Sequence, residues 1–150
     1  MAVHGVSRAT RDLDLLITVP AVLEHSAWSV LTNAGVTVDV RRGSTDDPLA
    51  GVVRISSADE RGVDVVVGRH AWQAAVVERA ADAEIDGQRV PVARAADLIL
   101  LKLYAGGPQD AWDIVQLLES GDRDALVDAV TSLVPALPLD ARALWQSVLR

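Results

Sequence analysis

The feature that most constrains this chain is a pair of aspartates, Asp12 and Asp14, at the entrance to the apolar run Leu15-Leu16-Ile17. Such a run predicts a strand, and alternate side chains of a strand point to the same face. The two Cα atoms would then lie roughly 6–7 Å apart. Two carboxylates at that spacing can converge on metal ions held about 3.5–4 Å apart, as in phosphoryl and nucleotidyl transfer. Solvated acids at strand ends are also common, so other parts of the sequence are needed to distinguish a metal-binding pair from solvated acids.

The order of the predicted elements indicates a mixed α/β fold with a C-terminal helical tail. Strands are predicted from apolar runs, a hairpin from the turn pair Asp86-Gly87, and helices from apolar residues at helical spacing. The predicted strands are 12–18, 36–40, 52–56 and 63–67, with a hairpin over 83–93, and the predicted helices are 20–33, 70–81, 95–104, 109–119, 123–134 and 140–149. We therefore expect an α/β core over 1–94 and a helical portion over 95–150 that packs on this core.

Composition narrows the classes of function. Of the 150 residues, 50% are hydrophobic, which is enough for a core and argues against disorder. The formal charge of −7 does not favour RNA or DNA as a partner, because phosphate contacts need clustered lysine and arginine. The chain has no cysteine, and no apolar run approaches the roughly 20 residues of a membrane span. No signal peptide is visible, so we expect a cytoplasmic protein with no membrane partner.

A third acid is normally needed from a neighbouring strand, because two acids on one strand hold a metal pair poorly. Asp64 is the first choice, since it opens the apolar run Val63–Val67, where a carboxylate is costly unless it is paired or bound to metal. Asp39, between Val38 and Val40, is the alternative. The more continuous run predicts the more central strand, which favours Asp64. Either acid could instead face outward from a half-exposed strand.

Two segments together resemble the nucleotidyltransferase superfamily, in particular its branch of AbiEii-like toxins and minimal nucleotidyltransferases. Residues 4–17, HGVSRATRDLDLLI, are similar to the Arg-x-Thr-x-Asp-x-Asp segment of this branch. Residues 97–114, DLILLKLYAGGPQDAWDI, are similar to its lysine-bearing helix, followed by a turn and the start of an Asp-x-x-Asp-Ile helix. The resemblance covers residues 3–118 and implies a nucleotidyltransferase-like mixed sheet with flanking helices.

The resemblance implies catalytic and metal-binding roles for Asp12, Asp14 and Asp64. Asp12 and Asp14 would coordinate two Mg²⁺ ions bound to a nucleoside triphosphate such as ATP. Asp64 would complete the second metal site and act as, or orient, the base for the attacking hydroxyl.

The same resemblance implies nucleotide-binding roles for three further residues. Arg8 would pair with phosphate oxygens. Thr10 would bond a phosphate or, as the simpler alternative, close the turn before the strand. Lys102 would reach the triphosphate from its helix, or would only extend its ammonium group to solvent at the helix end.

Departures from the family pattern bear on activity. The superfamily has a Gly-Gly or Gly-Ser turn upstream of the acid pair, where backbone amides cradle phosphates. Gly5 and Ser7 lie too close to Asp12 to be that turn and its helix, which is expected of a truncated start or a degenerate member. Gly107 and Gln109 also stand where the branch often has basic residues.

The implied function is metal-dependent transfer of a nucleoside monophosphate from a nucleoside triphosphate to a protein or RNA hydroxyl. The implied setting is a toxin–antitoxin pair, with a cognate toxin or antitoxin as partner. The alternative is a catalytically inactive nucleotidyltransferase-like module that binds a partner. A metal-dependent phosphohydrolase is a third interpretation.

Overall fold

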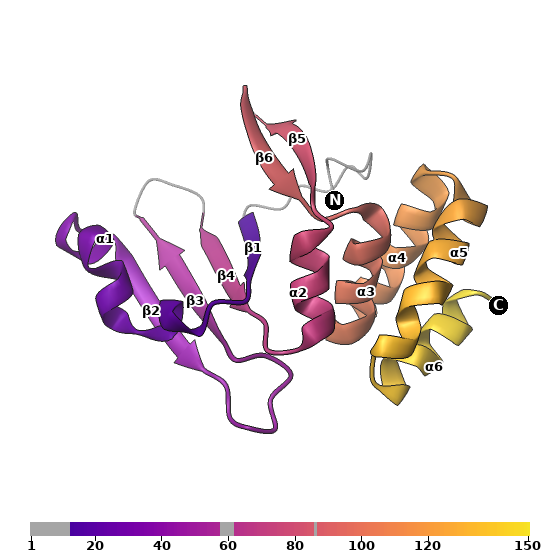
Figure 1. The fold of residues 1–150 in the computed structure, drawn as a ribbon, viewed down its shortest axis with the longest axis horizontal. Coiled ribbons are helices and arrows are strands. Elements are labelled where there is room, and N and C mark those ends of the chain that lie inside the picture. Colours follow the sequence, from indigo (N-terminus) through magenta and orange to yellow (C-terminus); the bar gives the residue numbers. More distant parts are fainter. Residues whose placement is uncertain (1–12, 58–61, 86) are drawn as a thin grey trace. The chain divides into compact units, whose positions relative to one another are not determined.

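The structure is a computed structural model that describes residues 13–57, 62–85 and 87–150. The chain is a mixed α/β protein with a four-stranded and a two-stranded sheet, as predicted (Figure 1). It divides into two compact units, and the sequence passes from one to the other between Glu78 and Arg79. We call the described residues up to Glu78 the sheet unit and those from Arg79 onward the helical unit. The hairpin at 81–92 thus groups with the helices, whereas the sequence had suggested a division after residue 94.

The sheet unit is built on four strands in the order β1-β4-β3-β2 (Figure 1). Their bounds are β1 Leu13–Ile17, β2 Thr37–Arg42, β3 Gly51–Ser56 and β4 Val63–Val67. Strand β1 runs parallel to β4, and β3 runs antiparallel to both β4 and β2. Strand β4, which carries Asp64, is therefore central, whereas β2, which carries Asp39, lies at an edge of the described sheet.

One face of this sheet forms a small hydrophobic core. Leu23, Val53, Val65 and Val67 are buried there, and partly buried apolar residues pack around them. Gly51 leaves room for Leu23, because a Cβ at this glycine would lie 2.6 Å from Cδ2 of the leucine. The core side chains lie on alternate residues of β3 and β4, so the other face of the sheet is free to carry charge.

The segment predicted as one helix over 20–33 is instead broken into three short pieces. They are the 3-10 turns η2 (Pro20–Leu23) and η3 (His25–Trp28) and the helix α1 (Ser29–Asn33). Glu24, between the turns, has extended backbone with φ −85° and ψ 129°. The break lets Leu23 enter the core, and the Trp28 indole N–H donates to the Val22 carbonyl at 2.6 Å. Burial thus overrides helical spacing in this segment. Helix α2 (Ala71–Glu78) completes the sheet unit.

The helical unit contains the hairpin and the C-terminal helices, close to their predicted positions (Figure 1). The bounds are β5 Ala81–Ile85, β6 Gln88–Val92, α3 Ala95–Ala105, α4 Pro108–Ser120, α5 Arg123–Leu133, η4 Val134–Ala136 and α6 Leu139–Val148. Helix α3 contacts α4, α5 and α6, and fully buried residues such as Ile99, Ile114 and Trp145 form the core between them. Gly106 ends α3 in the left-handed region with φ 68°, which suits glycine. No helix within the described ranges combines the length and the apolar character needed to cross a bilayer.

Candidate functional site

A row of four charged residues crosses one face of the four-stranded sheet. Asp14 is the register partner of Asp64, Asp64 of Arg54, and Arg54 of Asp39. Directly opposed residues of neighbouring strands project from the same face. Val65 and Val53, one residue along from Asp64 and Arg54, are buried on the other face. We call the face that bears the row the charged face.

Asp14 and Asp64 are adjacent on the charged face although they are distant in sequence. Their strands are parallel neighbours, so the two Cα atoms are separated by about 4.8 Å, the usual spacing of paired strands. Asp14 is exposed, and Asp64 keeps 21% of its side-chain surface exposed. Two carboxylates placed in this way can both reach one cation. The other residues expected beside them, Asp12, Arg8 and Thr10, lie outside the described residues.

Arg54 holds Asp64 through a two-pronged ion pair. Its Nε donates to Oδ1 and its Nη2 to Oδ2 of Asp64, both at 2.9 Å. These hydrogen bonds hold the pKa of Asp64 below its ordinary value of 3.8, although burial acts in the opposite direction. The pair explains how a carboxylate is tolerated at the start of an apolar strand.

Asp39, the alternative third acid, lies at the other end of the row. It is two strands from Asp64 and three from Asp14, or about 10 Å and about 14 Å at the usual strand spacing. Its Oδ2 accepts a hydrogen bond from Arg41 Nε at 2.8 Å. Strand β3 thus separates Asp39 from the two acids that share a register position.

A groove of about 370 Å³ adjoins the row on the β2–β3 side. Its charged lining residues are Asp39, Arg41, Arg42, Asp47 and Arg54. Within the loop that borders it, the backbone N–H of Ser44 donates to Asp47, and this bond holds the pKa of Asp47 below its ordinary value. Arg54 is therefore shared between the groove and the acid pair.

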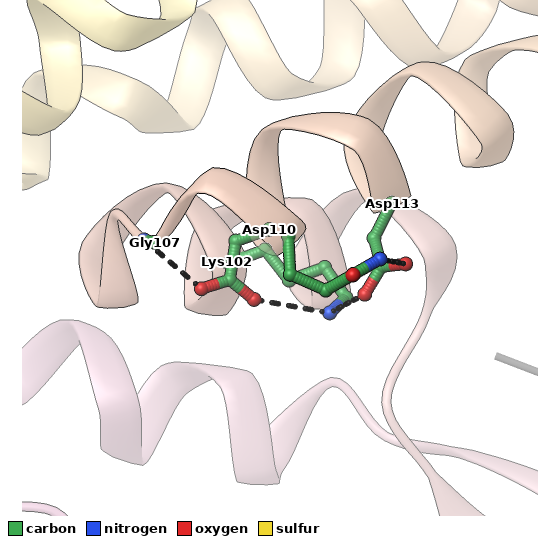
Figure 2. A network of polar contacts seen from close by, with 5 residues as sticks. Lys102, Gly107, Asp110 and Asp113 are labelled. Carbon is green, nitrogen blue, oxygen red and sulfur yellow. Dashed lines mark hydrogen bonds and ion pairs between the residues drawn. The ribbon is translucent and has the colours of Figure 1, made fainter.

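Lys102 lies in a separate network inside the helical unit (Figure 2). Its Nζ donates to Oδ2 of Asp113 at 2.5 Å and to Oδ1 of Asp110 at 3.2 Å. Asp110 also accepts from the backbone N–H of Gly107 at 3.1 Å, which caps the start of α4. Only 14% of the Lys102 side chain is exposed, and that of Asp113 is fully buried. The ammonium group is thus held by two carboxylates of the next helix.

The acid pair offers ligands suited to magnesium. Mg²⁺ prefers oxygen ligands, keeps several waters, and is commonly bound by one or two carboxylates together with substrate phosphates. Asp14 and Asp64 supply such carboxylates on one face of the sheet. Within the described ranges, no three His, Cys, Asp or Glu side chains gather closely enough to hold an ion by themselves. Asp14 and Asp64 are thus the described residues of this face that could supply carboxylate oxygens to a magnesium ion.

Two contacts in these networks were not anticipated from the sequence. Arg54 is an isolated charge in an apolar strand, as Asp64 is, and two opposite charges of this kind are a signal for cross-strand pairing. Lys102 and Asp113 stand on either side of the short turn at Gly106 and Gly107. Helices joined by so short a turn lie antiparallel, so charges near the joined ends meet.

Neither the protein-family models nor the curated protein sequences compared with this chain give a match.

Proposed function

We propose that this protein is a metal-dependent nucleotidyltransferase of the nucleotidyltransferase-like fold. The observation that supports this most strongly is the register of Asp14 opposite Asp64 on parallel neighbouring strands. The proposal needs a third acid from a neighbouring strand beside the acids of β1, and Asp64 lies opposite Asp14 as that role requires. The resemblance of residues 4–17 and 97–114 to the AbiEii-like branch supports the same proposal.

Each acid has a distinct role in this proposal. Asp14, with Asp12, would hold the metal ions, which when bound would supply charge to neutralise the triphosphate. Asp64 would complete the second metal site and would orient the attacking hydroxyl or accept its proton. Two Mg²⁺ ions, when bound, neutralise the charge that develops on the phosphates. Arg8 and Thr10 remain the proposed nucleotide contacts. Lys102, the third residue that the resemblance implies, would have to give up its pairing with Asp113 and Asp110 to reach a triphosphate.

We propose that the acceptor is a hydroxyl of a protein or of RNA and that the partner is a cognate toxin or antitoxin. The net charge of −7 favours the protein acceptor, because an acidic chain attracts an RNA backbone poorly. A cytoplasmic location accompanies this proposal.

The direct test is transfer of label from α-phosphate-labelled nucleotides in the presence of Mg²⁺, with candidate protein and RNA acceptors. Asp64→Asn should lower transfer at least about 100-fold, because it removes a metal ligand and a base. Asp82→Asn, an equivalent change on exposed strand β5, should leave transfer unchanged. A loss in Asp39→Asn as large as in Asp64→Asn would contradict the choice of Asp64.

The inactive partner-binding module stays as the second candidate because of one observation. Both oxygens of Asp64 are held by Arg54, and Lys102 is held by Asp113 and Asp110. Charges paired within the chain are also what a silent domain would show. Absence of label transfer, together with equally weak Mg-nucleotide binding by the wild type and Asp14→Asn, would favour this module. Release of free phosphate without transfer would indicate a phosphohydrolase.

A further inference from the structure

The carboxylate proposed to bind metal is held by a cation of the chain itself. Arg54 donates to both oxygens of Asp64 at 2.9 Å. A divalent ion bound to the same carboxylate would lie within a few ångströms of this guanidinium group, and like charges at that distance repel. Binding of a divalent ion to Asp64 therefore disfavours the present position of the Arg54 guanidinium group.

We propose that Arg54 is a placeholder cation, which neutralises Asp64 in the absence of metal and leaves it when a divalent ion binds. This inference rests on the proposed function, because it takes Asp14 and Asp64 as metal ligands. Arg54 is a positioning residue in this scheme, since it acts through Asp64.

The surroundings of Arg54 allow it to leave. Its side chain is 62% exposed, so water can solvate the guanidinium group once it leaves Asp64. It stands on β3, one strand further than Asp64 from Asp14, and it already lines the groove on the β2–β3 side. By contrast, the Lys102 side chain is only 14% exposed, and its ammonium group lies between two carboxylates.

The test is the affinity of the full chain for Mn²⁺ alone, measured by titration calorimetry and by the electron paramagnetic resonance signal of free Mn²⁺. Arg54→Gln removes the competing cation and should tighten Mn²⁺ binding by about three- to tenfold. Arg41→Gln is the matched control, because it removes one positive charge from the same face without contacting Asp64. It should change the affinity by less than about twofold, since salt screens charges about 10 Å apart.

A second measurement follows Arg54 directly. The Arg54 Nε–H signal in the ¹⁵N spectrum of the wild type is identified by its absence from the spectrum of Arg54→Gln. In the metal-free wild type, this signal should be protected from exchange with water. Saturating Mg²⁺ should remove that protection, whereas a signal that stays protected overturns the proposal.

The possible outcomes distinguish a failure of the placeholder role of Arg54 from a failure of the proposed metal site. Equal Mn²⁺ affinity in the wild type and Arg54→Gln, with binding lost in Asp14→Asn, overturns the placeholder role and leaves the metal site standing. Absence of Mn²⁺ binding in both the wild type and Arg54→Gln overturns the metal site as well. An equal gain in Arg54→Gln and Arg41→Gln assigns the effect to net charge and overturns the exchange.

Discussion

The ion pairs of the two units differ in how far their side chains are exposed to solvent. In the sheet unit, Arg54 pairs with Asp64 on a face where the arginine side chain is 62% exposed. In the helical unit, Lys102 pairs with an Asp113 that is fully buried, and Arg79 pairs with an Asp97 whose side chain is 2% exposed. An exposed pair can change partners at small cost, whereas a buried pair is locked by the cost of stripping water from an unpaired charge. Of these ion pairs, Arg54–Asp64 in the sheet unit is therefore the one expected to exchange partners most easily.

The largest effect is expected for Lys102→Met, which removes the Lys102 ammonium group from the buried carboxylate of Asp113. We expect the free energy of unfolding at pH 7 to fall by about 3 kcal/mol, as is typical when one partner of a buried pair is removed. Urea denaturation with a two-state analysis measures the change. The double variant Lys102→Met/Asp113→Leu should recover most of the loss, because it removes the stranded charge. A loss below about 1 kcal/mol in the single variant would contradict the distinction between the units.

A smaller effect is expected for Arg79→Met. Arg79 donates to both oxygens of Asp97, but Asp97 lies in the first turn of α3, where the helix dipole also stabilises a negative charge. We expect unfolding to become easier by about 2 kcal/mol in the same assay. A loss equal to or larger than that of Lys102→Met would show that the helix terminus contributes nothing to Asp97.

For Arg54→Gln we expect a loss of at most about 1 kcal/mol at pH 7, because the pair is partly solvated. The loss should also depend on pH. Arg54 lowers the pKa of Asp64, so this stabilisation is fully present above 3.8 and disappears as the pH falls through the lowered value. Denaturation of the wild type and the variant across acidic pH should therefore show two stability curves that converge below pH 3.8. Curves that stay parallel would show that the arginine acts by packing alone.

The smallest effect is expected for Asp39→Asn. The Asp39–Arg41 pair is exposed on an edge strand, with side chains 48% and 76% exposed. We expect a change within about 0.5 kcal/mol that vanishes in high salt, because exposed pairs are screened. Thermal unfolding at low and high ionic strength measures it. A salt-resistant loss would place Asp39 among the structurally important charges.

The sequence predicted the secondary structure well where local signals and tertiary packing agree. The apolar runs at 52–56 and 63–67 and the Gly-Gly-Pro break after α3 correspond to observed elements. The prediction was wrong over 20–33, where the insertion of Leu23 into the core outweighs helical periodicity. Local rules cannot see that contact, because the room for Leu23 is provided by Gly51 on another strand.

The candidate site was predictable to a smaller extent. The continuous apolar run after Asp64 correctly indicated a central strand, which explains why this acid, and not Asp39, comes to lie beside Asp14. The partner of Asp64 was not predictable in the same way. Pairing with Arg54 depends on the register between β3 and β4, and a shift of one residue would send Arg54 to the opposite face.

The position of β1 at the border of the described sheet has a mechanical consequence. Among the described strands, the one that carries Asp14 has a neighbour on one side, β4, whereas the one that carries Asp64 has neighbours on both sides. Border strands open more readily than interior ones. An ion held by both aspartates would link β1 to the interior strand β4 and make β1 open less often. The amide protons of 13–17 would then exchange more slowly with deuterium.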